Sequence, residues 1–245
     1  MTSPPRAPLR GTHLGLGTAL VLVTTALFAL SPTTALAKCA PGRPNSATVN
    51  WDGWKIAVSA PTGGVYANIL NYSPWVYNAP GSVAVGWSML VDTTDTGGSS
   101  YGQVGWYEQP GGARKTFAQW RECSTCTLIT QFAAAYPTNQ YTEYKVLWNN
   151  ACTSCLSFYA GGTRLWYDWV GYIPNQAQIF GEINNLASQM AGAGQEHEDF
   201  SNSHVFQGGW LAFNGMVGDS NFAYYSELYV SSLDFQIWDN ACLGT

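Results

Sequence analysis

The segment 141-YTEYKVLW-148 shows the pattern on which the interpretation of the fold depends. In an extended chain, Tyr144, Val146 and Trp148 fall on one face, while Glu143 and Lys145 fall on the other. Such an alternation of apolar and polar residues is typical of a half-buried β-strand. We therefore expect a strand from residue 141 to residue 148.

Similar runs recur along the chain and are separated by Gly, Pro, Asn and Ser, the residues that favour turns. The expected strands are Thr48–Ser59, Val65–Leu70, Val83–Val91, Gly102–Glu108, Lys115–Trp120, Leu156–Ala160, Arg164–Trp169, Glu196–Phe200, His204–Phe206, Phe222–Leu228 and Leu233–Trp238. Many short strands at this spacing predict an all-β fold. We expect an antiparallel β-sandwich of the jelly-roll or concanavalin-like type.

One segment departs from the strand pattern. Pro174-Asn175-Gln176 leads into a stretch whose apolar residues recur at helical spacing, and Gly192 follows as a stop signal. These apolar residues are Ala177, Phe180, Ile183, Ala187 and Met190. The sequence predicts one amphipathic helix near residues 176–190, lying across a sheet.

The N-terminal residues have the features of an export signal. Arg6 and Arg10 precede an uncharged apolar stretch, and Ala35-Leu36-Ala37 supplies the small residues that a signal peptidase requires. A transmembrane anchor is the alternative, but no basic flank follows the apolar stretch, whose length is near the lower limit for a span. We expect residues 1–37 to be a cleaved signal peptide and residues 38–245 to form a single secreted, extracellular domain.

The composition excludes some classes of partner. Removal of Arg6 and Arg10 leaves eight Lys and Arg against fifteen Asp and Glu, a net charge of −7. An acidic chain without a basic cluster argues against nucleic acids and anionic membranes as partners. Charged residues make up only 10% of the chain and aromatic residues 14%. Uncharged, aromatic-rich surfaces suit an extracellular polymer, glycan or peptide, as the partner.

All six cysteines lie beyond the expected signal peptide, and four of them form two CxxC motifs. They are Cys39, Cys123, Cys126, Cys152, Cys155 and Cys242. In a cytosolic chain, two CxxC motifs would suggest a zinc site, whereas after a signal peptide an even number of cysteines favours disulfides. We expect a Cys39–Cys242 bond and two bonds among the other four, in a pattern that the sequence leaves open. No metal or cofactor is expected.

A series of short motifs resembles neprosin-type domains. The motifs are Gly64-Val65-Tyr66-Ala67-Asn68-Ile69, Pro74, Gln103-Val104-Gly105-Trp106-Tyr107, Phe117-Ala118-Gln119-Trp120 and Gly171-Tyr172-Ile173-Pro174, followed by Ile179-Phe180 and Ile183. The resemblance covers most of the chain after residue 37. It implies a β-sandwich of the glutamic-peptidase kind, in which glutamates activate water for proline-directed peptide cleavage.

The carboxylates that such chemistry requires are incomplete in this chain. The resemblance places Gly53 where the family has its first Glu, and Asp52 is the nearest carboxylate. A shift of one residue on a strand turns the side chain to the opposite face. For the second Glu the candidates are Glu198 and Glu196, which would be paired with Asp52 or Glu108. The alternative is that the 196–199 cluster is a solvated edge strand and Glu108 an exposed charge at a strand end.

Exposed aromatic residues are the other candidates for a site. Trp75 beside Pro74, Trp210 after two glycines, and Asp168 between two aromatic residues are candidate ligand-binding residues. We therefore expect an extracellular binding protein for polysaccharide or cell-wall polymer. The alternatives are an extracellular glutamic-type endopeptidase with paired carboxylates and, third, a glycoside-active jelly roll.

Overall fold

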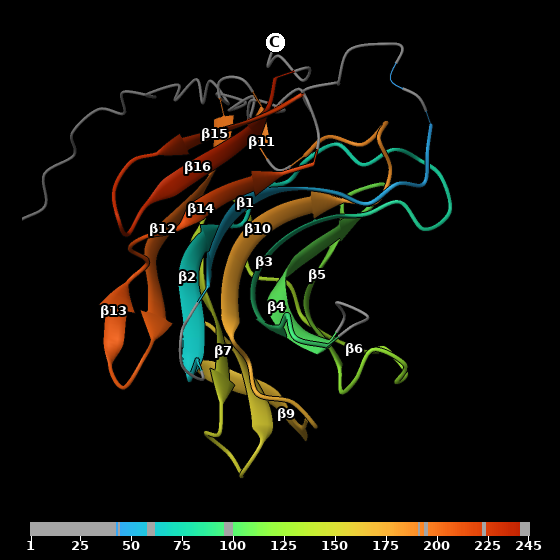
Figure 1. The fold of residues 1–245 in the computed structure, drawn as a ribbon. Coiled ribbons are helices and arrows are strands. Elements are labelled where there is room, and N and C mark those ends of the chain that lie inside the picture. Colours follow the sequence, from blue (N-terminus) through green and yellow to red (C-terminus); the bar gives the residue numbers. More distant parts are fainter. Residues whose placement is uncertain are drawn as a thin grey trace, which may run out of the picture. The chain divides into compact units, whose positions relative to one another are not determined.

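The described part of the chain forms two largely antiparallel β-sheets packed face to face, as a computed structural model shows (Figure 1). The structure describes residues 43, 45–57, 62–95, 100–190, 192–193, 196–221 and 224–240. The described residues form strands, turns and loops without an α-helix. The predicted all-β sandwich is therefore confirmed. Among these residues there is accordingly no helix that could cross a membrane.

The first sheet has seven strands in the order β14-β1-β10-β3-β4-β5-β6. Their bounds are β14 Val217–Ser220, β1 Asn50–Ala57, β10 Gln176–Ile183, β3 Ala84–Asp92, β4 Ser100–Gln109, β5 Ala113–Arg121 and β6 Ile129–Ala133. The strands β10 and β3 are long and visibly bent (Figure 1). Strand β10 comes late in the chain but is inserted between β1 and β3, so it lies inside the sheet.

The second sheet has nine strands, most of them in the order β15-β16-β11-β12-β2-β7-β8-β9, with β13 paired to β12. Their bounds are β15 Tyr225–Tyr229, β16 Phe235–Asp239, β11 Gly192–Ala193, β12 Glu196–Phe206, β2 Gly64–Leu70, β7 Tyr141–Trp148, β8 Cys155–Ala160, β9 Thr163–Trp169 and β13 Trp210–Ala212. The alternating segment 141–148 is β7, with the predicted bounds. The two strands expected over 196–206 form one strand with an irregularity between Ser201 and His204.

The core lies between the two sheets. Val65, Ala67 and Ile69 of β2 are fully buried there, as are Tyr144 and Val146 of β7. These residues alternate with half-buried or exposed ones along their strands, as the sequence pattern predicts. Each sheet therefore has an inner face toward the other sheet and an outer face turned away from it.

The predicted helix near residues 176–190 is wrong, because its first half is strand β10 and the rest forms turns and loops. Ala177, Ile179 and Ile183 pack in the inner core, whereas Phe180 packs on the outer face. A central strand with apolar residues on both faces can place them three residues apart by coincidence. This spacing resembles the periodicity of a helix, but it arises here because the strand is buried on both faces.

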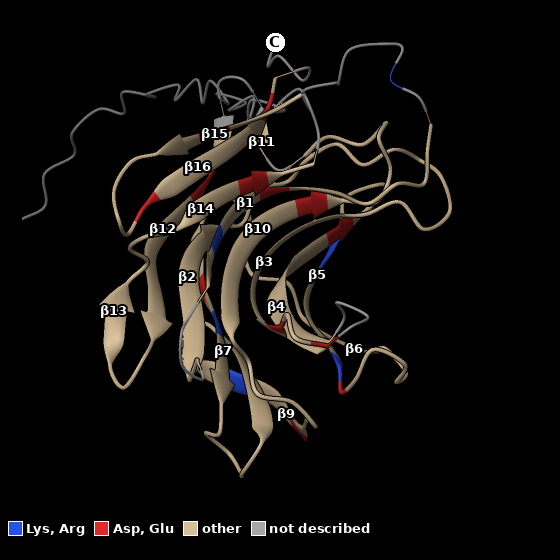
Figure 2. Ribbon diagram, in the orientation of Figure 1, with Lys and Arg blue, Asp and Glu red and all other residues tan. Residues whose placement is uncertain are grey.

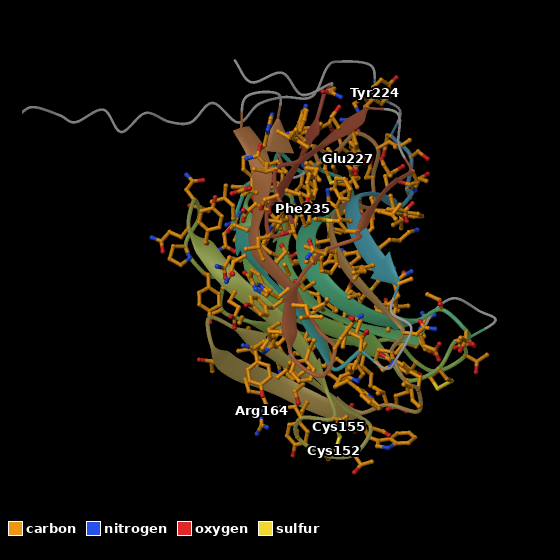
Figure 3. The ribbon with its side chains drawn as sticks, turned by 60° about the vertical axis from the view of Figure 1, so that its left-hand side comes forward. Cys152, Cys155, Arg164, Tyr224, Glu227 and Phe235 are labelled. Carbon is orange, nitrogen blue, oxygen red and sulfur yellow. A yellow bond between two sulfur atoms is a disulfide. The ribbon has the colours of Figure 1, made fainter. Side chains whose placement is uncertain are left out.

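Each CxxC motif forms its own disulfide, Cys123–Cys126 and Cys152–Cys155. Figure 3 shows Cys152 and Cys155 at the opposite end of the molecule from Tyr224. Disulfides favour an oxidising compartment. Cys39, Cys242 and the expected signal peptide lie outside the described residues.

Gly53 is required by close packing between β1 and β10. A Cβ atom built on Gly53 would lie 2.4 Å from the backbone oxygen of Ile179 and 2.8 Å from Cγ of Phe180. The backbone φ angle of Gly53 is also positive, at 157°. Phe180 thus occupies the outer-face space that a side chain at position 53 would need.

We predict that Gly53→Ala lowers the free energy of unfolding by at least about 2 kcal/mol, because backbone atoms of β10 cannot move aside cheaply. Gly209→Ala is the matched control, since its added Cβ would meet nothing within 4 Å. The control should stay within about 0.5 kcal/mol of the unmutated protein. Urea unfolding followed by circular dichroism measures both, and equal stability of the two variants would contradict the packing argument.

Candidate functional site

Polar side chains are aligned on the outer face of the seven-stranded sheet. In the strand register Gln178 of β10 pairs with Met89 of β3, Met89 with Gln103 of β4, and Gln103 with Gln119 of β5. Val104 and Trp106, which alternate with Gln103 along β4, face the core. The register thus brings three glutamines from distant parts of the sequence onto one row.

This row borders a hollow of about 460 Å³, which we call the outer hollow. It is lined by Val49, Trp51, Trp87, Met89, Val91, Tyr101, Gln103, Gln119, Gln178, Phe180, Glu182 and Asp219. Aromatic rings form much of the lining, and the rings of Trp87 and Phe180 are stacked with centroids 5.2 Å apart. A concave, mostly apolar site with a few convergent polar groups is typical of a ligand or active site.

Hydrogen bonds orient the glutamine side chains. The Tyr101 hydroxyl and Nε2 of Gln103 both donate to Oε1 of Gln119, each at 2.9 Å. Nε2 of Gln119 in turn donates to the Thr130 hydroxyl at 3.0 Å. The Gln103 amide group is therefore positioned before any ligand binds.

Glu182 is the carboxyl group with an unusual environment in this hollow. Burial raises its pKa from 4.5 to about 7. The indole N–H of Trp87 faces the carboxyl group and acts in the opposite direction, although it forms no hydrogen bond of good geometry here. The pKa of Tyr101 rises to about 12, first through burial and second through the negative charge of Glu182. Glu182 and Tyr101 therefore interact electrostatically across the hollow.

Glu198, a candidate from the sequence, lies between the sheets and not in the outer hollow. It is fully buried, and the indole N–H of Trp106 donates to its Oε1 at 2.9 Å. Burial raises its pKa well above the usual value. Gly86 leaves the space for this contact, since a Cβ there would lie 2.5 Å from the Trp106 nitrogen.

Glu108 and Trp75 are brought together at another hollow, of about 420 Å³. Nε of Arg114 donates to Oε2 of Glu108 at 3.1 Å, and the Ser73 hydroxyl donates to Oε1 at 2.8 Å. The backbone N–H of Trp75 donates to Oε1 of Gln189 at 3.0 Å. The Glu108 carboxylate is therefore already engaged by a cation and a hydroxyl.

Asp52 is fully buried on the inner face of β1, next to Glu227 of β15. Burial, followed by the charge of Glu227, raises the Asp52 pKa from 3.8 to about 8. The two carboxyl groups can share a hydrogen bond only when one of them carries a proton. Figure 2 shows the acidic segments of β1 and β10 next to each other, but Asp52 and Glu182 point to opposite faces.

The remaining candidates are dispersed. Glu196 begins β12, and its side chain lies outside the described part. Asp168 accepts a hydrogen bond from the Trp120 indole at 3.0 Å. Trp210 lies on the outer face of the nine-stranded sheet with 40% of its surface exposed. The structure thus does not gather the carboxyl groups that the sequence suggested into one groove.

Sequence reasoning missed Glu182 and did not single out Gln103. Glu182 fell within the expected amphipathic helix, where a charged residue is expected to face the solvent. The signal that could have revealed it is the alternation in 176-QAQIFGEI-183, where polar Gln176, Gln178 and Glu182 share one face. Gln103 stood inside one of the quoted motifs, but its neighbours in space are set by strand pairing.

Solved glutamic peptidases have this fold. Scytalido-glutamic peptidase bound to a peptide-based transition-state analogue aligns with a TM-score of 0.59 at 11% identity, covering 78% of this chain and 100% of that chain. SCP-B of the eqolisin family, in complex with the tripeptide Ala-Ile-His, aligns with a TM-score of 0.57 at 12% identity, again covering 78% of this chain and 100% of that chain. A Bacillus licheniformis β-glucanase aligns with a TM-score of only 0.38 at 10% identity, covering 76% of this chain and 70% of that chain.

No family model matches the sequence, and no curated protein matches it. The resemblance to neprosin-type domains therefore has no support from a family model. At 11–12% identity, the structural likeness concerns the fold alone. The fold of this chain is that of the glutamic peptidases.

We predict that the protein is more stable in mild acid than at pH 8. A carboxyl group whose pKa is raised by folding contributes its full stability below the pKa of the unfolded chain. That contribution is lost as the pH rises through the folded pKa, here from 3.8 to about 8 for Asp52 and from 4.5 to about 7 for Glu182. Each pKa unit is worth about 1.4 kcal/mol, or roughly 3–5 °C in Tm for a domain of this size.

Thermal unfolding at pH 5 and pH 8 measures the effect, with an expected fall in Tm of at least roughly 5 °C. In Asp52→Asn, which cannot ionise at this position, the fall should be smaller. A Tm that rises between pH 5 and pH 8 would contradict the assignment of protonated, buried carboxyl groups.

Proposed function

We propose that this protein is a glutamic-type peptidase whose catalytic groups are Glu182 and Gln103 in the outer hollow. The observation that carries the proposal is that Glu182, whose pKa burial raises to about 7, and the hydrogen-bonded carboxamide of Gln103 line the same aromatic-walled hollow. The fold shared with solved glutamic peptidases supports the reaction class.

The chemistry follows from the two groups. The charged Glu182 carboxylate takes a proton from a water molecule, which attacks the peptide carbonyl carbon. The Gln103 amide group donates one of its N–H bonds to Gln119 and has a second N–H available for the developing oxyanion. The proton held by Glu182 then passes to the leaving amine as the C–N bond breaks.

The environment of each group fits its role. A general base works best when its pKa is near the working pH, and burial moves Glu182 to that range. The hydrogen bond to Gln119 orients Gln103 without a reorganisation cost during the reaction. Apolar rings from Trp51, Trp87 and Phe180 favour peptides with apolar side chains beside the cleaved bond.

The other carboxyl groups with raised pKa values are less suited to this role. Glu198 and Asp52 are fully buried inside the sandwich, so a peptide cannot reach them without opening the fold. Glu108 borders a hollow but is paired with Arg114, with their side-chain atoms 3.0 Å apart. Burial raises the pKa of Glu108, but its two carboxylate oxygens already accept hydrogen bonds from Ser73 and Arg114, so neither is free to take a proton from water.

We further propose that the protein acts outside the cell on, or bound to, an extracellular polymer. The expected signal peptide and the two disulfides support this location. Binding of polysaccharide, the function that the composition favoured, is compatible with a peptidase, because the exposed Trp210 lies on the other sheet.

We predict that Glu182→Gln lowers kcat/KM on peptide substrates by about 10²–10⁴, because the carboxamide cannot accept the proton from water. Gln103→Ala should lower it by about 10²–10³ through loss of an oxyanion donor. The assay is cleavage of a quenched fluorescent peptide library by the protein beginning at residue 38, from pH 3 to pH 8.

Glu143→Gln is the matched control, since Glu143 is a partly exposed carboxylate of β7 that pairs with Lys145 on the other sheet. It should retain the activity of the unmutated protein. Absence of peptide cleavage at every pH would overturn the proposal. So would full activity of Glu182→Gln together with loss of activity in Glu198→Gln or Asp52→Asn.

We predict that Trp87→Phe shifts the pH profile of kcat/KM. The Trp87 indole N–H lowers the pKa of Glu182, and phenylalanine keeps the stacked ring but removes that N–H. The pKa of Glu182 should rise, so the ascending limb of the profile should move to higher pH. A shift to lower pH, or an ascending limb that stays in place, would contradict an influence of the Trp87 N–H on the group that titrates.

A further inference from the structure

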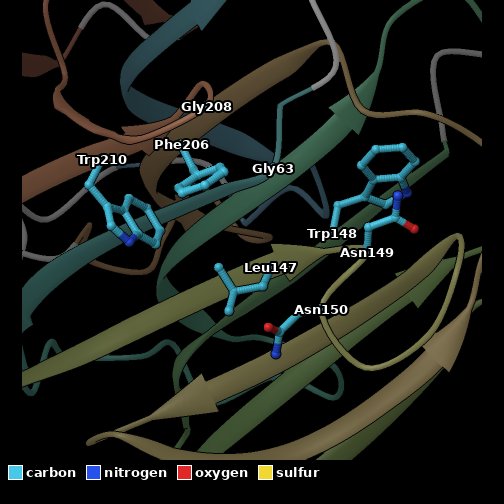
Figure 4. Close-up of a pocket in the computed structure, with 8 residues that line it drawn as sticks. All are labelled: Gly63, Leu147, Trp148, Asn149, Asn150, Phe206, Gly208 and Trp210. Carbon is cyan, nitrogen blue, oxygen red and sulfur yellow. The ribbon is translucent and has the colours of Figure 1, made fainter.

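The outer face of the nine-stranded sheet has a pocket that the peptidase chemistry does not use. It has a volume of about 520 Å³ and is lined by Gly63, Leu147, Trp148, Asn149, Asn150, Phe206, Gly208 and Trp210 (Figure 4). We call it the Trp210 pocket. The outer hollow, by contrast, lies on the seven-stranded sheet.

Two glycines let aromatic rings lie directly on the backbone of the sheet. A Cβ on Gly63 would lie 2.4 Å from the Phe206 ring, and a Cβ on Gly64 would lie 3.1 Å from the Trp210 ring. Any larger residue at these positions would push the rings outward. The pocket therefore depends on Gly63, which precedes β2, on Gly64 of β2, and on the aromatic rings of the β12–β13 hairpin.

The Trp210 side chain is held in one orientation. Its ring packs edge-to-face against Tyr66, with centroids 4.7 Å apart, and against Phe206, with centroids 5.3 Å apart. Even so, 40% of Trp210 is exposed. A rigid, exposed indole is pre-organised to receive a flat apolar surface, because little side-chain entropy is lost on binding.

The polar groups of the pocket are uncharged. None of the lining residues is ionisable, and Asn149 and Asn150 supply carboxamide groups. Nδ2 of Asn150 donates to the Tyr159 hydroxyl at 2.6 Å, which orients this side chain. Such a lining suits a neutral ligand that has both apolar C–H faces and hydroxyl groups.

From this pocket a row of residues crosses the sheet to a second exposed ring. The register joins Phe206 to Gly64, Gly64 to Leu147, Leu147 to Ser157 and Ser157 to Tyr167. Tyr167 is 56% exposed, and the guanidinium of Arg164 lies 5.0 Å from its ring centre. Four interstrand spacings of about 4.8 Å separate the ends of the row by about 19 Å.

We propose that the two ends of this row, the Trp210 pocket and Tyr167, bind a linear neutral polysaccharide that passes over the fully buried Ser157 between them. The C–H faces of sugar rings pack on the Trp210 and Tyr167 rings, and sugar hydroxyls bond with Asn149 and Asn150. A peptide is a poorer ligand here, since the row crosses strands whose backbone groups already pair with each other. The inference is independent of the peptidase proposal, because the two sites lie on different sheets.

The test titrates the protein beginning at residue 38 with cellohexaose, laminarihexaose and mannohexaose by isothermal calorimetry. At least one of these neutral oligosaccharides should bind. Trp210→Ala should weaken that binding at least about tenfold, Tyr167→Ala should weaken it by a smaller factor, and Trp210→Phe should retain part of it.

Tyr229→Ala is the matched control, because Tyr229 is 51% exposed on β15 of the same sheet but lies off the row. It should bind like the unmutated protein, and thermal unfolding should show that each variant is folded. Lack of binding to all three oligosaccharides would overturn the proposal. Equal weakening by Trp210→Ala and Tyr229→Ala would also overturn it, as would Trp210-dependent binding of a proline-rich peptide without binding of any sugar.

Discussion

The position of β10 inside the seven-stranded sheet is the constraint on which the rest of the structure depends. Because β1 and β3 flank it, its inner face must fill the core with Ala177, Ile179 and Ile183. Its outer face then carries Phe180 and Glu182 into the outer hollow. Gly53 must be a glycine for the same reason, since Phe180 lies over it.

Burial without an ion pair explains the raised pKa values of three carboxyl groups. Asp52, Glu182 and Glu198 all have raised pKa values, and desolvation is the largest cause for each. Inside the sandwich such groups stay neutral and act as hydrogen-bonding parts of the core. In the outer hollow the same effect gives a carboxyl group that can exchange a proton near neutral pH. The position in the fold, more than the residue type, thus distinguishes the buried carboxyl groups of Asp52 and Glu198 from the proposed catalytic carboxyl group of Glu182.

The two outer faces of the sandwich have different chemistry. The outer face of the seven-stranded sheet combines aromatic walls with an ionisable carboxyl group, which suits a reaction. The row that runs from Trp210 across the nine-stranded sheet to Tyr167 combines exposed rings with carboxamides, which suits binding. A peptidase attached to an insoluble polymer would act on proteins held near that polymer. Both faces draw on the low charge and high aromatic content of the chain.

The sequence by itself determined the all-β class, because the alternation of apolar and polar residues in segments such as 141–148 indicates which face of the strand is buried. It also predicted disulfide bonding, and the structure shows a bond within each CxxC motif, whereas export stays a prediction. Only the tertiary structure decided that residues 176–183 form a strand, since Phe180 is buried on the outer face and interrupts the alternation of polar and apolar residues there. The pairing of Gln103 with Gln119, and the distance of both from Asp52, likewise follow from strand register, a long-range property that local sequence does not encode.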